Sequence, residues 1–291
     1  MEFETKGDKV DEIPVEINYR IIELFSAGLY SSPNKAFEEL VSNSYDADAD
    51  KVAVYIPDDL DLENTYTWVC DNGTSMDSNG LKLLWRIGET NKKSENYKGK
   101  RKPIGQFGIG KLATYILSNK LTHICKSNGE FRAVTMDYGV VSEAPAGEGI
   151  STKKISLDER KLTEQEVKEI LEPIITREGK MITNFDLWGE KATDSWTIAI
   201  MSNLRERGKS LKQGMLRWIL RTALPISPGF NLSFNGEKLE PSKYTGSIIK
   251  EWVIGKDDDI AEREGYECRE KEGEYFVDLP TLKNVKGKLT L

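Results

Sequence analysis

The stretch Glu39–Ala47, with the sequence ELVSNSYDA, constrains the fold more than any other part of this chain. Successive residues of an α-helix are about 100° apart, so Glu39, Asn43 and Asp46 would fall within roughly 60° of one another. The residues suited to packing gather on another face: Phe37, Leu40, Val41 and Ser44. The pattern predicts a helix that packs on one face and can hold a polar site on the other. By itself it also fits an ordinary amphipathic helix whose polar face meets water.

Length and composition indicate a globular protein with more than one domain. The chain has 291 residues, of which 38% are hydrophobic and 31% charged, and this length exceeds that of a usual single domain. Neither a bilayer-spanning apolar stretch nor the charge pattern of a secretory signal is found. We therefore expect a cytoplasmic protein with no membrane partner.

The scarcity of histidine and cysteine narrows the chemistry. The three cysteines are isolated, so we interpret them as reduced structural thiols. The one histidine, His123, lies in a strand-like segment, and neither a Ser-His-Asp triad nor a His-rich metal site is expected. The net charge of -7 argues against a globally basic nucleic-acid binder, although basic residues cluster between Lys92 and Lys102.

Periodicity and turn residues predict the order of the elements. We expect helices at 21–29, 81–87, 112–117 and 209–224, and a helix that bears Glu39 and that residues 31–34 can cap. A further helix starts with the capping box of Thr163 and Glu166 and ends near Pro173. We expect strands at 51–56, 66–70, 121–125, 130–136, 150–157, 181–187 and 196–201. The strands at 121–125 and 130–136 should form a hairpin around Asn128-Gly129. In the helix at 209–224, one side carries Leu211, Met215, Trp218 and Ile219. Grouped antiparallel-looking strands predict an α+β fold, a two-layer sandwich of one sheet and one helical layer.

The prolines that close the helix at 209–224 mark a change of domain. We expect residues 1–205 to form the first domain with an N-terminal strap, and 206–291 to begin a second, β-rich α/β domain. The strand-and-turn signal at 230–236 would open this second domain. A strand at 285–291 ends the chain abruptly, so we expect it to be a fragment of a longer protein.

Three motifs recur in order: the polar helix face, the turn DNGTSM at 71–76, and the loop GQFGIG at 105–110 before a helix. A glycine-rich loop leading into a helix can present N–H groups to phosphates, but it can also be only a turn. This loop lacks the P-loop pattern, a Rossmann crossover and the downstream segments of a kinase. A different nucleotide fold is required.

Together these motifs resemble the GHKL ATPase superfamily, which includes DNA gyrase, the ninety-kilodalton heat-shock chaperones, the sensor histidine kinases and the MutL proteins. The segment GLYSSP at 28–33, followed by ELVSNSYDA, is most similar in motif to the chaperone and MutL branches. The ordered set spans roughly residues 20–125, which is far more specific than any single motif. The resemblance implies a Bergerat-type ATP-binding fold with ATP and Mg²⁺ as ligands.

The resemblance implies a role for each matching position. Glu39 would orient or deprotonate the attacking water, and Asn43 would bind Mg²⁺ through its amide oxygen. Asp71 would accept a hydrogen bond from the adenine amino group, Gly73 would let the base approach the backbone, and Met76 would pack against the purine. The phosphates would be surrounded by the loop and the residue after it: Gly105, Gln106, Phe107, Gly108, Ile109, Gly110 and Lys111.

The remaining positions leave alternatives open. The basic segment from Thr90 to Lys102, which includes Lys92, would form the lid over ATP. Asp46 shares the polar face, but its side chain can brace the turn that follows the helix. Lys111 can contact a phosphate or be solvated. Ser75 stands where the family usually has a second glycine, which puts nucleotide affinity in doubt.

The function implied by the resemblance is an ATPase that acts as a conformational switch. ATP binding would close the lid and pair two protomers into a homodimer, and hydrolysis would reopen them. A client protein or DNA would bind through sequence beyond Leu291. The alternatives are a nucleotide-binding signalling module that does not hydrolyse ATP, and an ATPase subunit of a DNA-repair or anti-phage defence system.

Overall fold

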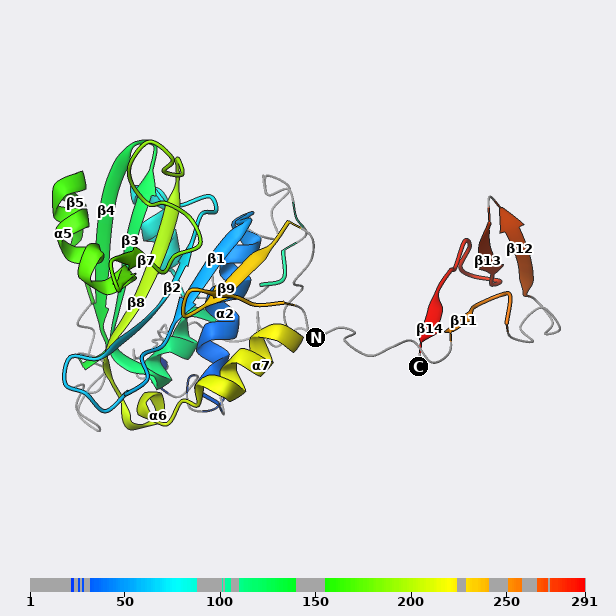
Figure 1. Cartoon of the computed structure of the whole chain (residues 1–291), viewed down its shortest axis with the longest axis horizontal. Helices are drawn as coiled ribbons and strands as arrows, with labels where there is room; N and C mark the ends of the chain where they lie inside the picture. The colour runs from blue at the N-terminus through cyan, green and yellow to red at the C-terminus, as the bar shows by residue number, and fades with distance from the viewer. Residues whose placement is uncertain are drawn as a thin grey trace, which may run out of the picture. The chain divides into compact units, whose positions relative to one another are not determined.

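The structure, a computed structural model, divides the chain into two compact units, Met1–Pro241 and Ser242–Leu291. It describes residues 32–87, 110–139, 155–223, 229–240, 251–257, 266–271 and 273–290, together with residues 22, 23, 26, 28, 101 and 103–105. Figure 1 shows both units. Within these residues, no helix is both long enough and apolar enough to cross a membrane.

An eight-stranded sheet forms the centre of the first unit. Among its described pairs, only β1 and β9 run parallel, and all others are antiparallel. The spatial order of the strands is β10 (Glu237–Lys238), β9 (Asn231–Phe234), β1 (Lys51–Tyr55), β2 (Tyr66–Asp71), β8 (Trp196–Leu204), β3 (Ser118–Ser127), β4 (Glu130–Asp137) and β5 (Glu159–Leu162). A separate two-stranded ribbon consists of β6 (Thr176–Arg177) and β7 (Lys180–Met181).

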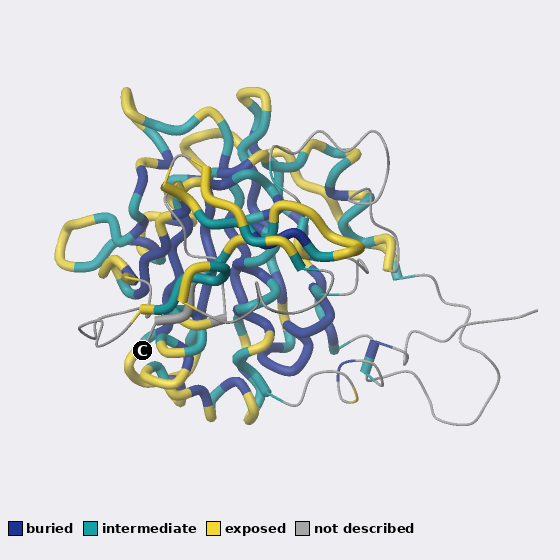
Figure 2. Tube along the Cα trace, turned by 90° about the vertical axis from the view of Figure 1, so that its right-hand side faces the viewer, coloured by how far each residue is buried: buried dark blue, intermediate teal, exposed yellow. Residues whose placement is uncertain are grey.

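Helices cover both faces of this sheet. They are α2 (Asn34–Asp46), α3 (Ser78–Leu84), the 3₁₀ helix η3 (Gly110–Ile116), α5 (Glu164–Ile175), α6 (Glu206–Lys209) and α7 (Gln213–Ala223). Residues from α2, η3 and α7 pack with alternate strand residues such as Val52 and Val69 in one core. The intervening strand residues, such as Ala53 and Trp68, point to the opposite face and pack with residues of α5 in a second core. Figure 1 shows α2 and α7 together and α5 apart from them, and Figure 2 shows buried segments in the interior.

The predicted α+β sandwich is confirmed, and α5 adds cover to the second face of the sheet. The alternation of strand residues explains both cores, because a sheet with apolar residues on both faces must be covered on both sides.

Predictions that rest on specific cap and turn chemistry agree with the structure. In the capping box of α5, the Glu166 carboxylate accepts a hydrogen bond from the Thr163 N–H at 2.7 Å, and the Thr163 hydroxyl accepts one from the Glu166 N–H at 3.3 Å. The helix continues beyond Pro173 to Ile175. The hairpin of β3 and β4 turns at Asn128 and Gly129, whose φ angles of 52° and 75° suit a tight two-residue turn.

Two strand predictions are wrong in the residues that the structure describes. Residues 155–158 are irregular, and β5 begins at Glu159. Most of 181–187 is also irregular, although Phe185 and Leu187 are buried in the second core. The carbonyl of Leu187 accepts a hydrogen bond from the Trp196 indole N–H at 3.1 Å. A buried loop therefore carries an apolar pattern like that of a strand.

The helix predicted at 209–224 begins later, as α7, and the side chains that α7 buries differ from those expected. α6 ends at Lys209 and α7 begins at Gln213. Met215 and Trp218 are 53% and 60% exposed, whereas Leu216 and Leu220 are fully buried. The helix carries apolar residues around much of its circumference, so the sequence pattern did not select the packed side.

The first compact unit ends later than the domain boundary expected at residue 205. β9 pairs in parallel with β1, in the register Lys51↔Asn231, and α7 packs against α2. Residues 206–241 therefore complete the first sheet and its helical layer. The strand-and-turn signal at 230–236 is real, but it belongs to this sheet.

The second unit consists of short antiparallel strands in the residues described. β11 (Glu251–Val253) pairs with β14 (Lys288–Thr290), and β12 (Glu267–Lys271) pairs with β13 (Glu274–Asp278). The Asp278 carboxylate accepts hydrogen bonds from the Arg269 guanidinium at 3.0 Å and from the Asn284 N–H at 2.6 Å. These bonds hold the β12–β13 hairpin against the segment that follows it.

Candidate functional site

The helix α2 separates packing from polar residues as the sequence predicts. Its buried residues include Phe37, Leu40, Val41 and Ser44, which belong to the face predicted to pack. Glu39 and Asn43, one helical turn apart, are only partly buried. The helix therefore holds two polar side chains at the surface of a packed layer, where a ligand can reach them.

The end of the glycine-rich loop lies directly against Glu39. A Cβ atom built on Gly110 would overlap the Glu39 carboxylate oxygen, so only a glycine leaves this carboxylate where it is. Residues that are distant in sequence thus meet at one point. The predicted site residues Thr90, Lys92, Gln106, Phe107, Gly108 and Ile109 lie outside the described residues.

Lys111 is buried, with 6% of its surface exposed, so the solvated alternative does not hold. Burial and, to a smaller extent, the nearby Lys111 charge together lower the pKa of His123 to about 4. His123 therefore stays neutral in strand β3, which agrees with its predicted structural role. The contact of Lys111 with a phosphate remains a prediction.

Asp46 fixes the start of the glycine-rich loop. Its buried carboxylate accepts hydrogen bonds from the N–H groups of Ile104 at 2.7 Å and Gly105 at 2.9 Å. The bracing of the turn after the helix stays a prediction, and the structure shows that Asp46 holds the start of the loop. Gly105 thereby reaches the C-terminal end of α2.

Arg101 attaches the end of the basic segment to the same end of α2. Its guanidinium donates hydrogen bonds to the carbonyls of Ala49 at 2.6 Å and Gly229 at 2.8 Å. It also lies 4.8 Å from the centre of the Tyr45 ring, within the range of a cation–π contact. The segment before the glycine-rich loop is thus held at a second point.

Asp71 is a buried carboxylate at the end of β2. It accepts hydrogen bonds from the Ser44 hydroxyl and from the Gly73 N–H, both at 2.9 Å. Burial raises the pKa of Asp71 to about 6, and these two hydrogen bonds lower it by less. Each carboxylate oxygen keeps a further acceptor position, so the group can receive a hydrogen bond from a ligand.

Gly73 is required for a close approach between the turn and α2. A Cβ atom at this position would lie 2.6 Å from the Ala47 carbonyl oxygen. The neighbouring Thr74 N–H donates to the same carbonyl at 2.7 Å. The structure thus gives Gly73 a packing role, while its predicted role in admitting the base remains untested.

Ser75 and Thr197 complete this corner of the site, and sequence reasoning missed Thr197. The Ser75 hydroxyl donates to the Trp196 carbonyl at 2.8 Å and lies 2.8 Å from the Thr197 hydroxyl oxygen. Thr197 is the cross-strand partner of Asp71. No sequence motif marks Thr197, because only the pairing of β2 with β8 brings it to this place.

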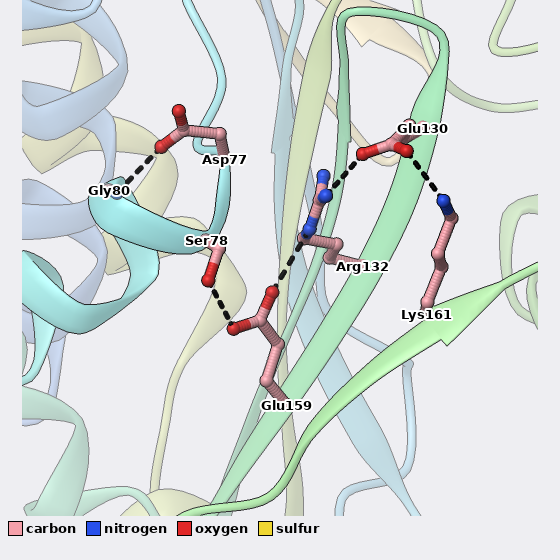
Figure 3. Close-up of polar contacts among 7 residues, drawn as sticks. All are labelled: Asp77, Ser78, Gly80, Glu130, Arg132, Glu159 and Lys161. Carbon is pink, nitrogen blue, oxygen red and sulfur yellow. Dashed lines mark hydrogen bonds and ion pairs between the residues drawn. The ribbon is translucent and has the colours of Figure 1, made fainter.

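Met76 ends the turn at 71–76, and α3 follows this turn. Met76 packs against a small core formed by Leu81, Cys125 and Val134. Asp77 caps α3 by accepting from the Gly80 N–H at 2.8 Å, as Figure 3 shows. The figure also shows the bonds that tie α3 to the edge of the sheet: Ser78 donates to Glu159 at 2.7 Å, and Glu159 pairs with Arg132 at 3.0 Å.

The donor set on α2 fits Mg²⁺ bound together with phosphates. Within the described part of the chain, no group of three or more His, Cys, Asp or Glu side chains could hold a metal ion. Mg²⁺ commonly takes one or two protein oxygens and completes its shell with water and substrate phosphates. The Asn43 amide oxygen, beside the Glu39 carboxylate and the glycine-rich loop, matches this requirement.

Two comparisons agree with this arrangement. Residues 30–170 match a family described as histidine kinase-, DNA gyrase B- and HSP90-like ATPases. The chain is also similar to the chaperone protein HtpG of Rhodococcus jostii (strain RHA1), with 22% identity over 175 residues that cover 49% of this chain and 27% of that protein. The matched family region contains α2, the turn at 71–76 and the glycine-rich loop. Over residues 30–170, the first unit therefore belongs to the histidine kinase-, DNA gyrase B- and HSP90-like ATPase family.

Proposed function

We propose that this protein binds Mg-ATP between α2 and the turn at 71–76 and hydrolyses it to ADP and phosphate. The observation that carries the proposal is the contact of the Glu39 carboxylate with Gly110, where the glycine-rich loop ends. A carboxylate at the end of a phosphate-binding loop is placed to act on a water molecule beside the terminal phosphate. The base would lie at the other end of the site, against Asp71.

The chemistry required of the protein is positioning and neutralisation of charge. Asn43 would hold Mg²⁺ together with the phosphates, and this ion supplies neutralisation of the phosphate charge. Glu39 would accept the proton of the attacking water. Water would form a bond to the γ-phosphorus while the bond to the β,γ-bridging oxygen breaks, which releases ADP and inorganic phosphate. Backbone N–H groups of the glycine-rich loop would stabilise the developing charge.

We further propose that ATP occupancy controls a conformational switch. The segment from Thr90 to Lys102 would close over the nucleotide, and two protomers would pair in this state. Support comes from the described residues at the C-terminal side of this segment: Arg101 bonds to Ala49, and Gly105 bonds to Asp46, so both are held at the end of α2. The similarity to the chaperone HtpG favours a client protein as the partner. The second unit would begin the domain that transmits the change, and the protein would work in the cytoplasm.

A substitution of Glu39 tests hydrolysis separately from binding. Glu39→Gln keeps the size of the side chain but removes its ability to accept a proton. We expect the ATPase rate to fall by about 100-fold or more, the contribution typical of a general base, while the Kd for ADP stays unchanged. Phosphate release measures the rate, and calorimetric titration measures the Kd.

The neighbouring Glu38 provides a matched control. Its carboxylate pairs with Lys35 at 2.7 Å along α2, away from Gly110. Glu38→Gln should therefore leave both rate and affinity unchanged. If the wild-type protein binds ADP but releases no phosphate as a dimer, the domain is a non-hydrolysing nucleotide-binding module, and the ATPase proposal is wrong.

A further inference from the structure

Three side chains from neighbouring strands form a row on the helical face of the sheet at the proposed base pocket. Asp71 of β2 pairs with Thr197 of β8, and Thr197 pairs with Cys125 of β3. Directly opposed residues of antiparallel strands point to the same face, with their Cβ atoms about 5 Å apart. Asp71 and Thr197 therefore present their oxygen atoms side by side.

The hydrogen bonds of Ser75 determine the direction of the Thr197 proton. A serine hydroxyl has one proton, and Ser75 donates its proton to the Trp196 carbonyl at 2.8 Å. In the 2.8 Å contact between the two hydroxyls, Thr197 must then be the donor. The one proton of Thr197 is used within the protein, and its oxygen has only lone pairs left for a ligand.

The Cys125 thiol does not change the direction of the hydrogen bonds between Thr197, Ser75 and the Trp196 carbonyl. Burial raises the pKa of Cys125 to about 11, although the nearby hydroxyls of Ser75 and Thr197 lower it, so the thiol stays protonated at neutral pH. A protonated thiol is a weak acceptor and does not compete with the Ser75 oxygen for the Thr197 proton. The chain from Thr197 through Ser75 to the Trp196 carbonyl thus runs in one direction.

We infer that Ser75 is a positioning residue that makes the base pocket selective for a purine with an exocyclic amino group at position 6. Asp71 accepts hydrogen bonds, and Ser75 makes Thr197 an acceptor as well. Two neighbouring acceptors attract an amino group, which has two hydrogens, and repel the carbonyl oxygen that hypoxanthine carries at the same position. The pocket would reject hypoxanthine because the carbonyl oxygen of this base and the oxygens of Asp71 and Thr197 are all acceptors, so that no donor stands between them. The inference rests on the proposed nucleotide site and adds Ser75 as the residue that orients Thr197 toward the base.

Titration of ADP and inosine diphosphate into the whole protein at pH 8 tests this inference. The wild type should bind ADP more tightly than inosine diphosphate by about 100-fold. In Ser75→Ala the Thr197 hydroxyl can turn and donate, so the ratio of the two Kd values should fall by about tenfold. Ser75→Thr keeps a hydroxyl and should restore the ratio.

Ser195 offers a matched control for general loosening of the turn. Its hydroxyl donates to the Gly73 carbonyl at 2.8 Å and has no hydrogen bond to Thr197 in the described structure. Ser195→Ala should weaken both nucleotides by the same factor and leave their ratio unchanged. A Ser75→Ala protein that also keeps the wild-type ratio would overturn the inference.

Titrations of the wild-type protein distinguish failure of this inference from failure of the proposed function. If it binds ADP and inosine diphosphate equally well, Ser75 sets no selectivity, while the nucleotide site itself stands. If it binds neither nucleotide, the proposed function fails and the inference fails with it.

Discussion

The two ends of the candidate site are built from different kinds of structure. The base side lies on the sheet, where Asp71 and Thr197 are cross-strand partners and Ser75 bonds to β8. The phosphate side lies on α2 and on the glycine-rich loop, where Glu39 meets Gly110. Neighbouring strands are locked by repeated backbone hydrogen bonds, whereas a loop depends on a few anchors such as Asp46.

Under the proposed function, this difference separates recognition of the base from chemistry at the phosphates. The acceptors of the base side hold their positions before any ligand arrives, so selectivity costs little reorganisation. The residues proposed to act on the phosphates lie on α2 and at the end of the glycine-rich loop, and the proposed hydrolysis requires a site that excludes water. Changes to the base side should therefore alter affinity, and changes to the phosphate side should alter the rate. The following predictions test this division, from the largest expected effect to the smallest.

Asp71→Asn should weaken ADP binding most. The carboxylate would bond to the base as a charged acceptor, and its loss should raise the Kd for ADP by about 100-fold at pH 7.5. Asp77→Asn is the matched control, because Asp77 caps α3 beside the same turn and asparagine is also a good cap. Calorimetric titration of both variants measures the effect, and an unchanged Kd in Asp71→Asn would remove Asp71 from the base pocket.

Gly110→Ala should slow hydrolysis without weakening adenosine binding. The added methyl group overlaps the Glu39 carboxylate and must displace it. We expect the ATPase rate to fall by about tenfold or more, since catalysis is sensitive to small displacements of the base. Gly214→Ala in α7 meets open space and should leave the rate unchanged. A loss of adenosine affinity with an unchanged ATPase rate would contradict the separation of the site into a base side and a phosphate side.

Affinity for adenosine, which has no phosphate to titrate, should depend on pH through Asp71. Burial raises the pKa of Asp71 to about 6, and the base requires the ionised form. Below pH 6 the proton must leave on binding, so the Kd should rise by about tenfold between pH 7 and pH 5. Asp71→Asn should show no such dependence.

The stability of the ligand-free protein should respond to pH with the opposite sign. The folded-state pKa of Asp71 lies above its ordinary value of 3.8, so its contribution to the free energy of unfolding is full below pH 3.8. This contribution is lost as the pH rises through about 6, because the buried carboxylate then ionises. Urea unfolding of the wild type and Asp71→Asn across this range measures the difference, and parallel curves would refute it.

Asp46→Asn should have the smallest effect, confined to the phosphate side. Of the two N–H groups of Ile104 and Gly105, one would keep a neutral amide oxygen as acceptor, and the other would face an NH2 group in place of an acceptor. The free energy of unfolding should fall by about 1–2 kcal/mol, and affinity for adenosine should stay unchanged. Asp59→Asn, at an exposed turn, should change neither quantity. Adenosine binding that weakens in Asp46→Asn would show that the two ends are coupled.

Local sequence signals predicted the elements that carry the site. The spacing of α2, the β3–β4 hairpin turn and the capping box of α5 each depend on residues close together in the chain. Predictions failed where an apolar pattern was compatible with two structures. The residues around Phe185 fit a strand but form a buried loop, and α7 packs on a different side from the one expected. The domain boundary also differed, because the pairing of β9 with β1 joins segments far apart in sequence.

The sequence by itself determined which residues could carry chemistry: the polar face with Glu39 and Asn43, the acidic turn at Asp71, and the glycine-rich loop. Only the tertiary structure decided that Asp46 holds the loop and that Ser75 and Thr197 stand beside Asp71. The physical reason is that helical periodicity and turn chemistry act over a few residues. The register between β2 and β8, in contrast, joins segments more than a hundred residues apart, and it emerges only when the whole sheet packs.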